Sequence, residues 1–263
     1  MLETAILGDT MAPARVQAGA PEMNQKRWYV GAAIVLVAII ATACGPQPTG
    51  PTTTLLPASP PYCPFDAHLV MFGGDSLATQ WPNDVTLTSG TTAFNTAVGG
   101  SAYGGSYTSG VDTIGDRVLA QLNNCGNDVA VAALSGGVND ISQGQPVATA
   151  IAGIRALDVE LHARGVHAVF LTIHPVPDTT AWFAANQSRR RQINTWMTTP
   201  GNMFGTVVNC SPFLESSPGS DILARPYWLT DDFGTVDTVH LNAAGYQSMA
   251  ACAEPAILTA PGS

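Results

Sequence analysis

Short apolar runs alternate along this chain with longer segments of helical pattern, and this alternation constrains the fold most. Such runs are typical of strands that are buried on both faces of a sheet. The runs are His68 to Phe72, Val129 to Leu134, Ala168 to Ile173 and Phe204 to Val208. Because strands and helices alternate, we predict an α/β fold of three layers, α/β/α, around a central and mostly parallel sheet. Ligands bind at the carboxyl ends of the strands in such sheets, so the chemistry should directly follow the apolar runs.

Three other segments carry the spacing of helices. In residues 146–164 the apolar side chains that share one helical face are Ile154, Leu157 and Leu161. A second helical pattern follows Val111, and a third begins near Ala243. The chain has 263 residues, which is enough for one well-packed domain. We place this domain at residues 62–263 and expect it to be a monomer.

The N-terminal region has the pattern of an export signal. An apolar stretch from Val30 to Ala43 follows Lys26 and Arg27. It is short for a membrane span but suits the apolar core of a signal peptide. We therefore expect residues 1–43 to direct export, with Met23 as the true start of translation.

The end of the apolar stretch predicts how the signal is processed. The residues Ala41 to Cys44 resemble a bacterial lipobox, although leucine is usual at the position of Ala41. This predicts lipidation of Cys44 and a cell-envelope lipoprotein that contacts the membrane through its lipid. Ordinary cleavage after the A-x-A site would give a secreted protein, and no cleavage would leave residues 28–43 as the anchor. Residues 44–61 are rich in proline and threonine and should form an extended tether.

The charge distribution argues against a nucleic-acid partner. The net charge is -9, and Lys26 is the sole lysine of the chain. A basic patch that could neutralise phosphates is therefore missing. The run Arg189 to Arg191 is short, and we expect it to form the solvated face of a helix.

Four cysteines remain when Cys44 is set apart: Cys63, Cys125, Cys210 and Cys252. An even number in an oxidising compartment predicts two disulfides. No two of them have C-x-x-C spacing, which disfavours a zinc site. Four cysteines allow three pairings. If Cys63 and Cys125 open neighbouring strands, these two could pair.

A serine stands in a glycine-containing turn directly after the first predicted strand. The turn is Gly73 to Leu77, and it would present the hydroxyl of Ser76 at the carboxyl edge of the sheet. A serine hydroxyl becomes an effective nucleophile only when a base removes its proton. The alternative is that Ser76 only caps a following helix.

The candidate base is His240, which follows Asp237 by three residues in a turn ahead of the last helix. At this spacing the carboxylate can reach the imidazole, fix its tautomer and stabilise its charged form. The alternative is a solvated pair on a surface loop. His174 ends a predicted strand and could line the same pocket, but without a nearby carboxylate in the sequence we expect it to be a loop residue.

Two other segments could donate hydrogen bonds to a developing oxyanion. Asn139 follows Gly136 and Gly137 after the run that ends at Leu134, and it offers a side-chain amide. Gly99 and Gly100 lack side chains, so a backbone N–H group there can approach a substrate closely. Loss of one such donor typically costs about a hundredfold to a thousandfold in turnover. The alternatives are a simple turn residue and a flexible loop.

In chain order these segments resemble the sequence blocks of the SGNH hydrolase family, also called GDSL-like. The blocks are Gly74 to Leu77, Asn95 to Gly100, Gly137 to Asp140 and Asp237 to His240. The resemblance implies the flavodoxin-like fold of that family. It also implies a role for each residue: Ser76 is the nucleophile and a backbone donor, Gly100 and Asn139 are further oxyanion donors, His240 is the base, and Asp237 orients it. No metal or organic cofactor is implied.

The resemblance further implies hydrolysis of a carboxylic acyl or acetyl ester through an acyl-enzyme on Ser76. The substrate would be a small-molecule, glycan or lipid ester. An alternative from another class is a surface lipoprotein that uses the fold to bind carbohydrate or lipid, although the complete residue set argues against it. Trp81 and Trp228 could stack on a sugar or pack in and around the core.

Overall fold

A central sheet of five parallel strands organises the protein in the computed structural model, which describes residues 69–105, 110–125 and 128–260. Its strands lie in the order β2-β1-β3-β4-β5. Their bounds are β1 Leu69–Gly74, β2 Thr92–Asn95, β3 Val129–Ser135, β4 His167–Leu171 and β5 Thr206–Val208. This order is that of the flavodoxin-like sheets. The predicted α/β class with a parallel central sheet is confirmed.

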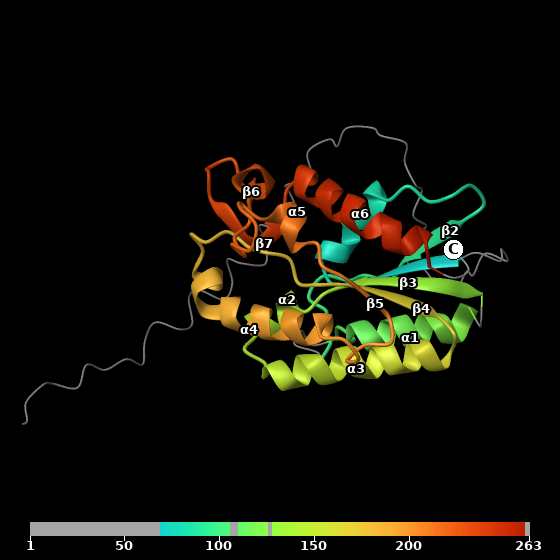
Figure 1. Ribbon diagram of the computed structural model, residues 1–263. Helices are drawn as coiled ribbons and strands as arrows, with labels where there is room; N and C mark the ends of the chain where they lie inside the picture. Colours follow the sequence, from blue (N-terminus) through green and yellow to red (C-terminus); the bar gives the residue numbers. More distant parts are fainter. Residues whose placement is uncertain (1–68, 106–109, 126–127, 261–263) are drawn as a thin grey trace, which may run out of the picture. The chain divides into compact units, whose positions relative to one another are not determined.

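Helices cover both faces of the sheet, which gives the predicted three layers (Figure 1). One face carries α1 (Ile114–Cys125), α3 (Val147–Ala163) and α4 (Ala181–Thr198), and the other carries α6 (Ala243–Leu258). Short elements complete the fold: η1 (Leu77–Thr79), η2 (Trp81–Asp84), α2 (Val138–Ser142), α5 (Ser211–Leu214) and η3 (Arg225–Tyr227). None of the described helices is both long and apolar enough to cross a membrane.

The central strands β1 and β3 are buried along almost their whole length because both of their faces are covered. All six residues of β1 are buried, and so are six of the seven residues of β3. The helices turn one apolar face to the sheet, and the face predicted for residues 146–164 is confirmed. In α3 the buried side chains include Ile154, Leu157 and Leu161, and in α1 they include Ile114, Val118 and Leu122.

The run Arg189 to Arg191 lies in a helix, as expected, and this helix is α4, whose buried face includes polar side chains as well as apolar ones. The expectation that Arg189 to Arg191 form a solvated face is wrong for Arg190, which is fully buried. Its guanidinium forms an ion pair with Asp221 and donates to the backbone oxygen of Ile173 at 2.9 Å. A buried charge of this kind is stable only when it is paired and hydrogen-bonded.

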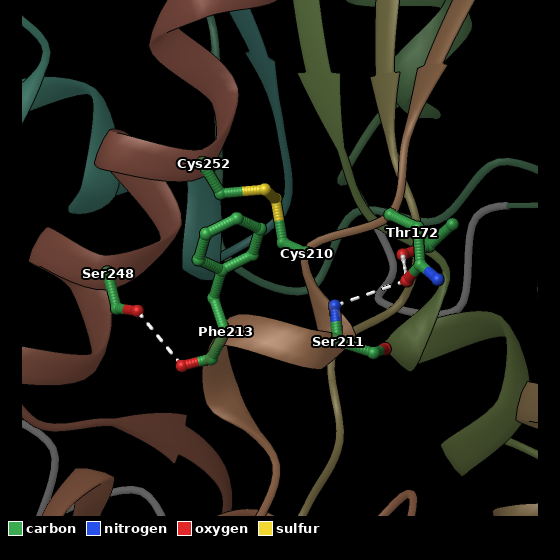
Figure 2. The surroundings of a disulfide bond; sticks show 7 residues. Thr172, Cys210, Ser211, Phe213, Ser248 and Cys252 are labelled. Carbon is green, nitrogen blue, oxygen red and sulfur yellow. Dashed lines mark hydrogen bonds between the residues drawn. A yellow bond between two sulfur atoms is a disulfide. The ribbon is translucent and has the colours of Figure 1, made fainter. Parts of the chain in front are cut away.

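A disulfide joins the segment before α5 to helix α6. Cys210 precedes α5 and is bonded to Cys252 in α6 (Figure 2). Cys125 is disulfide-bonded as well. It does not open a strand, as the proposed pairing with Cys63 assumed, but is the last residue of α1. Cys63 lies outside the described residues, so that pairing stays a prediction.

A separate two-stranded sheet lies beside the main one. It consists of β6 (Trp228–Thr230) and β7 (Val236–Leu241), which pair in the antiparallel direction. Asp237 and His240 were expected in a turn, but both belong to β7. The main sheet has its reversal of strand order at β1, with β2 on one side and β3 on the other. In sheets of this kind, ligands bind at the carboxyl ends of the strands next to this reversal.

Candidate active site

Ser76 follows β1 at the reversal of strand order, in a turn that requires glycine. Gly74 has a φ of 148°, and a Cβ atom there would lie 1.8 Å from the backbone oxygen of Ser135. Ser76 is the N-cap residue of η1, but its side chain makes no capping hydrogen bond. Its Oγ instead lies 2.9 Å from Nε2 of His240. The alternative of a serine that only caps a helix is therefore wrong.

Asp237 and His240, both in β7, continue this chain of hydrogen bonds. Nδ1 of His240 lies 3.1 Å from Oδ2 and 3.2 Å from Oδ1 of Asp237. Oδ1 of Asp237 also accepts the backbone N–H groups of Val239 at 2.8 Å and His240 at 2.7 Å. Both side chains are about two-thirds buried, so this is not the solvated surface pair of the alternative interpretation.

The hydrogen bonds around Asp237 and His240 shift the pKa values of the two side chains in opposite directions. Burial raises the pKa of Asp237, but the hydrogen bonds from His240 and from the backbone outweigh it and lower this pKa to about 2. The pKa of His240 is raised, mainly because its imidazole is hydrogen-bonded to Asp237 and despite the opposing effect of burial. Asp237 is thus a carboxylate at neutral pH, in the position to stabilise a proton that arrives on His240.

The glycine loop, which contains Gly99 and Gly100, lies against the serine turn of Gly73 to Leu77. Gly100 has a φ of 83°, which favours glycine. The backbone N–H of Val98 donates to the oxygen of Gly74 at 3.2 Å, and the side-chain amide of Asn139 donates to the oxygen of Ser101 at 2.9 Å. Within the described residues, the backbone N–H groups of Ser76 and Gly100 have no acceptor. The structure therefore brings the serine turn, the glycine loop and Asn139 together.

The carboxylate of Asp140 binds the backbone that directly follows Gly99 and Gly100, a role that was not predicted from the sequence. Its carboxylate accepts the backbone N–H groups of Tyr103 at 2.9 Å and Gly104 at 2.7 Å. Burial raises the pKa of Asp140, and these two hydrogen bonds oppose that rise. The signal in the sequence was the position of Asp140 directly after Asn139 in the third block.

The other residues that the sequence suggested for binding or lipidation do not belong to this hydrogen-bonded group. Trp81 is fully buried, with its ring edge-on to Phe72, so the sugar-stacking alternative is wrong for it. Trp228 is half-buried and donates its indole N–H to the oxygen of Leu223 at 2.9 Å. Cys44 lies outside the described residues. Within those residues, no group of three or more His, Cys, Asp or Glu side chains could hold a metal ion.

A serine, a histidine and an aspartate joined in this order, at the carboxyl edge of a parallel sheet, are the arrangement that defines the serine hydrolases as a class. The comparison with protein families is more specific. The GDSL-like Lipase/Acylhydrolase family matches residues 49–248. The chain belongs to this family, which confirms the resemblance seen in the sequence. Hydrolysis of esters is the activity at the level of the family.

Solved structures of bacterial proteins share this fold. The lipase/acylhydrolase from Enterococcus faecalis has 15% identity and a TM-score of 0.51, with 72% of this chain and 95% of that chain covered. A member of the lipolytic protein G-D-S-L family from Veillonella parvula has 16% identity and a TM-score of 0.51, with coverage of 71% and 95%. A carbohydrate acetylesterase from Sinorhizobium meliloti has 12% identity and a TM-score of 0.52, with coverage of 70% and 94%. A comparison with curated proteins gave no match.

Proposed function

We propose that this protein is an exported esterase that cleaves a carboxylic acyl or acetyl ester through an acyl-enzyme on Ser76. One observation carries the proposal: Oγ of Ser76 lies 2.9 Å from Nε2 of His240, whose other ring nitrogen is hydrogen-bonded to Asp237. A base must be within hydrogen-bond reach of the proton that it removes, and His240 meets this condition.

The reaction would proceed in two steps. In the first, His240 takes the proton of Ser76 while Oγ attacks the ester carbonyl, and His240 then gives this proton to the departing alcohol. In the second, His240 takes a proton from water, the hydroxide attacks the acyl-enzyme, and the proton returns to Ser76 as the acid leaves. Asp237 keeps its negative charge throughout, because its pKa of about 2 lies far below neutral pH.

The negative charge that develops on the carbonyl oxygen would be stabilised by three donors. These are the backbone N–H groups of Ser76 and Gly100 and the side-chain amide of Asn139. The amide of Asn139 already donates one hydrogen to Ser101, so its second hydrogen would serve the oxyanion. Donors that are fixed before the reaction stabilise the transition state without reorganisation, which is why they contribute so much to the rate.

Export is supported by the sequence before residue 44 and by the disulfides. Bonds such as Cys210–Cys252 persist in oxidising compartments outside the cytoplasm. In the proposed route the signal is removed before Cys44, whose lipid anchors the protein on the outer face of the membrane, and residues 44–61 hold the esterase away from it. Mass spectrometry of the mature N-terminus distinguishes a lipidated Cys44 from simple secretion or from an uncleaved anchor.

The esterase proposal is tested with p-nitrophenyl esters of increasing acyl length, from acetyl to palmitoyl. We expect the purified protein to hydrolyse part of this series and Ser76→Ala to lose about a thousandfold or more of kcat. Ser188→Ala removes an exposed hydroxyl on α4 and is the matched control, which should behave like the parent.

The preferred acyl length then separates an acetyl or short-chain esterase from a lipase. Equal, background-level rates for the parent and Ser76→Ala on every ester would contradict the general esterase function. That result would leave an enzyme of very narrow specificity or a binding lipoprotein.

A further inference from the structure

His174 follows β4 and is almost completely buried, with 2% of its surface exposed. Its Nε2 lies 2.7 Å from the backbone oxygen of Val239. A carbonyl oxygen can only accept a hydrogen bond, so Nε2 of His174 must carry the hydrogen. His174 lies in the loop after β4, as expected from the sequence, but its side chain also reaches across to the strand that carries His240.

Both the N–H group and the carbonyl group of Val239 form hydrogen bonds with side chains. It lies between Asp237 and His240 in the sequence, and its N–H donates to Oδ1 of Asp237 at 2.8 Å. Its carbonyl accepts the hydrogen of His174 at 2.7 Å. The peptide groups that connect the aspartate to the histidine are therefore fixed by the hydrogen bonds of the Val239 and His240 N–H groups to Asp237 and by one hydrogen bond from His174 in the segment after β4.

The segment that carries His174 is itself tightly bound to α4. Asn194 accepts the backbone N–H of Ile173 at 2.9 Å and donates to its oxygen at 2.8 Å. Arg190 donates to the same oxygen at 2.9 Å and forms an ion pair with Asp221. Because both polar groups of Ile173 are used, the backbone before His174 has little freedom. His174 thus extends from a rigid base to the strand of the catalytic pair.

We propose that His174 is a positioning residue, which holds Val239 so that Asp237 and His240 stay aligned with Ser76. The proposal rests on the proposed esterase function for its kinetic consequence. Its structural consequence, an intact Asp237–His240 hydrogen bond, can be measured without turnover.

The charged groups around His174 keep it neutral in this role. Burial lowers the pKa of His174 to about 4, although the hydrogen bond to Val239 opposes this. Arg190 on α4 and His240 on β7 lower the pKa further, whereas Asp237 on β7 raises it. His174 therefore carries no charge at neutral pH and leaves the charge on His240 unopposed.

Two variants of similar length separate the hydrogen bond from the packing. In His174→Gln the amide nitrogen stands as many bonds from the backbone as Nε2 does, so it can donate to Val239, and it has no charge at any pH. His174→Met fills a similar volume without a donor. We expect His174→Met to lose roughly 10- to 100-fold in kcat with little change in KM, because a small misplacement of a catalytic group is enough for such a loss. His174→Gln should stay close to the parent.

The second readout is the pKa of His240, followed by NMR of the imidazole signals in the parent and both variants. In His174→Met this pKa should fall toward the ordinary value, because the bond to Asp237 loosens, and in His174→Gln it should stay at the parent value. His174→Asn, whose amide is too short to reach Val239, is a second donor-free variant in case methionine prevents folding. Equal kcat and equal His240 pKa in the donor and donor-free variants would overturn the proposal. If the parent shows no hydrolysis that depends on Ser76, the esterase function fails, and the His240 pKa alone then decides the role of His174.

Discussion

Asp75, the residue directly before the proposed nucleophile, is fully buried. Its Oδ1 accepts the backbone N–H of Leu77 at 3.0 Å, but within the described residues Oδ2 has no partner. Burial raises the pKa of Asp75 to about 7, and the hydrogen bond from Leu77 and the nearby His240 only partly oppose this. A carboxyl group that is hidden from water without full pairing favours its neutral form. The folded protein therefore retains a proton on Asp75 at pH values where the unfolded chain has lost it.

This retained proton predicts how stability depends on pH. Below an ordinary pKa of 3.8 both states are protonated, and between 3.8 and about 7 only the folded state is. The free energy of unfolding should therefore fall as the pH rises through this window, by on the order of 4 kcal/mol from this group. Asp75→Asn keeps an acceptor for Leu77 without the charge, so its decline should be smaller by a few kcal/mol. Urea unfolding at pH 4.5 and 8 measures the difference.

The control for this measurement is Asp128→Asn, which changes an exposed carboxylate and should leave the decline as it is. The raised pKa of His240 adds stability that is likewise lost as the pH rises through the folded-state value. Asp128→Asn keeps that contribution, whereas Asp75→Asn also removes the interaction of Asp75 with His240, so the comparison reports Asp75 together with this interaction. A parent-like decline in Asp75→Asn would show that this carboxyl group is ionised in the folded state.

At the scale of elements, the β6–β7 hairpin is joined to the rest of the fold through Asn242. This residue follows β7 and is the N-cap of α6, where its side-chain oxygen accepts the N–H of Gly245 at 3.0 Å. Its side-chain nitrogen donates to the oxygens of Pro226 at 2.7 Å and Trp228 at 3.1 Å. One side chain thus joins the start of α6 to η3 and to β6, the strand that pairs with the His240 strand β7.

Asn242→Ala and Asn242→Ser separate these two functions. Serine can still cap α6, but it is too short to reach Pro226 and Trp228. We expect Asn242→Ala to lower the free energy of unfolding by about 2–3 kcal/mol and Asn242→Ser to recover about 1 kcal/mol of this loss. Both should lose several-fold in kcat, because neither holds the hairpin. Thermal unfolding and ester hydrolysis are the two measurements, and a serine variant with full activity would assign Asn242 to the helix cap alone.

At the scale of the molecule, the predictable elements are those with an apolar pattern of their own. The strands β1, β3 and β4 were recognised because their apolar residues are buried on both faces, and the edge strand β5 was recognised from the apolar residues of its run although it is only partly buried. Strand β2 has four residues, of which only Ala93 and Phe94 are buried, so it gave too short a signal. Helix α4 turns polar side chains inward, where they bind the backbone of other segments, and such contacts leave no periodic apolar pattern.

The difference between local sequence patterns and long-range contacts also applies to the site. Ser76, Asp237 and His240 stand in short blocks that a family resemblance can identify. His174 acts through a contact that no local pattern records, since its backbone partner Val239 lies 65 residues away along the chain. Only the folded chain brings these partners together. Sequence can therefore identify the groups that would react, but the residues that hold them require the structure.

The Cys210–Cys252 disulfide closes a loop that contains the whole β6–β7 hairpin. Its ends are separated by 42 residues, and closing such a loop in the unfolded chain corresponds to about 4 kcal/mol in the chain-entropy description. We expect Cys210→Ser combined with Cys252→Ser to lower the Tm by roughly 4 to 16 °C. At 25 °C kcat should change by less than about twofold, because the hydrogen bonds of Ser76, His240 and Asp237 do not involve this bond. Calorimetry and ester hydrolysis on the oxidised parent and the double variant test both statements.

A parent-like Tm would mean that the bond does not restrict the unfolded chain. A large loss of kcat at 25 °C would mean that the hairpin needs the bond to keep His240 at Ser76. If the expected pattern is found, the protein depends on an oxidising compartment for its stability and not for its chemistry, which is the combination that an exported esterase requires.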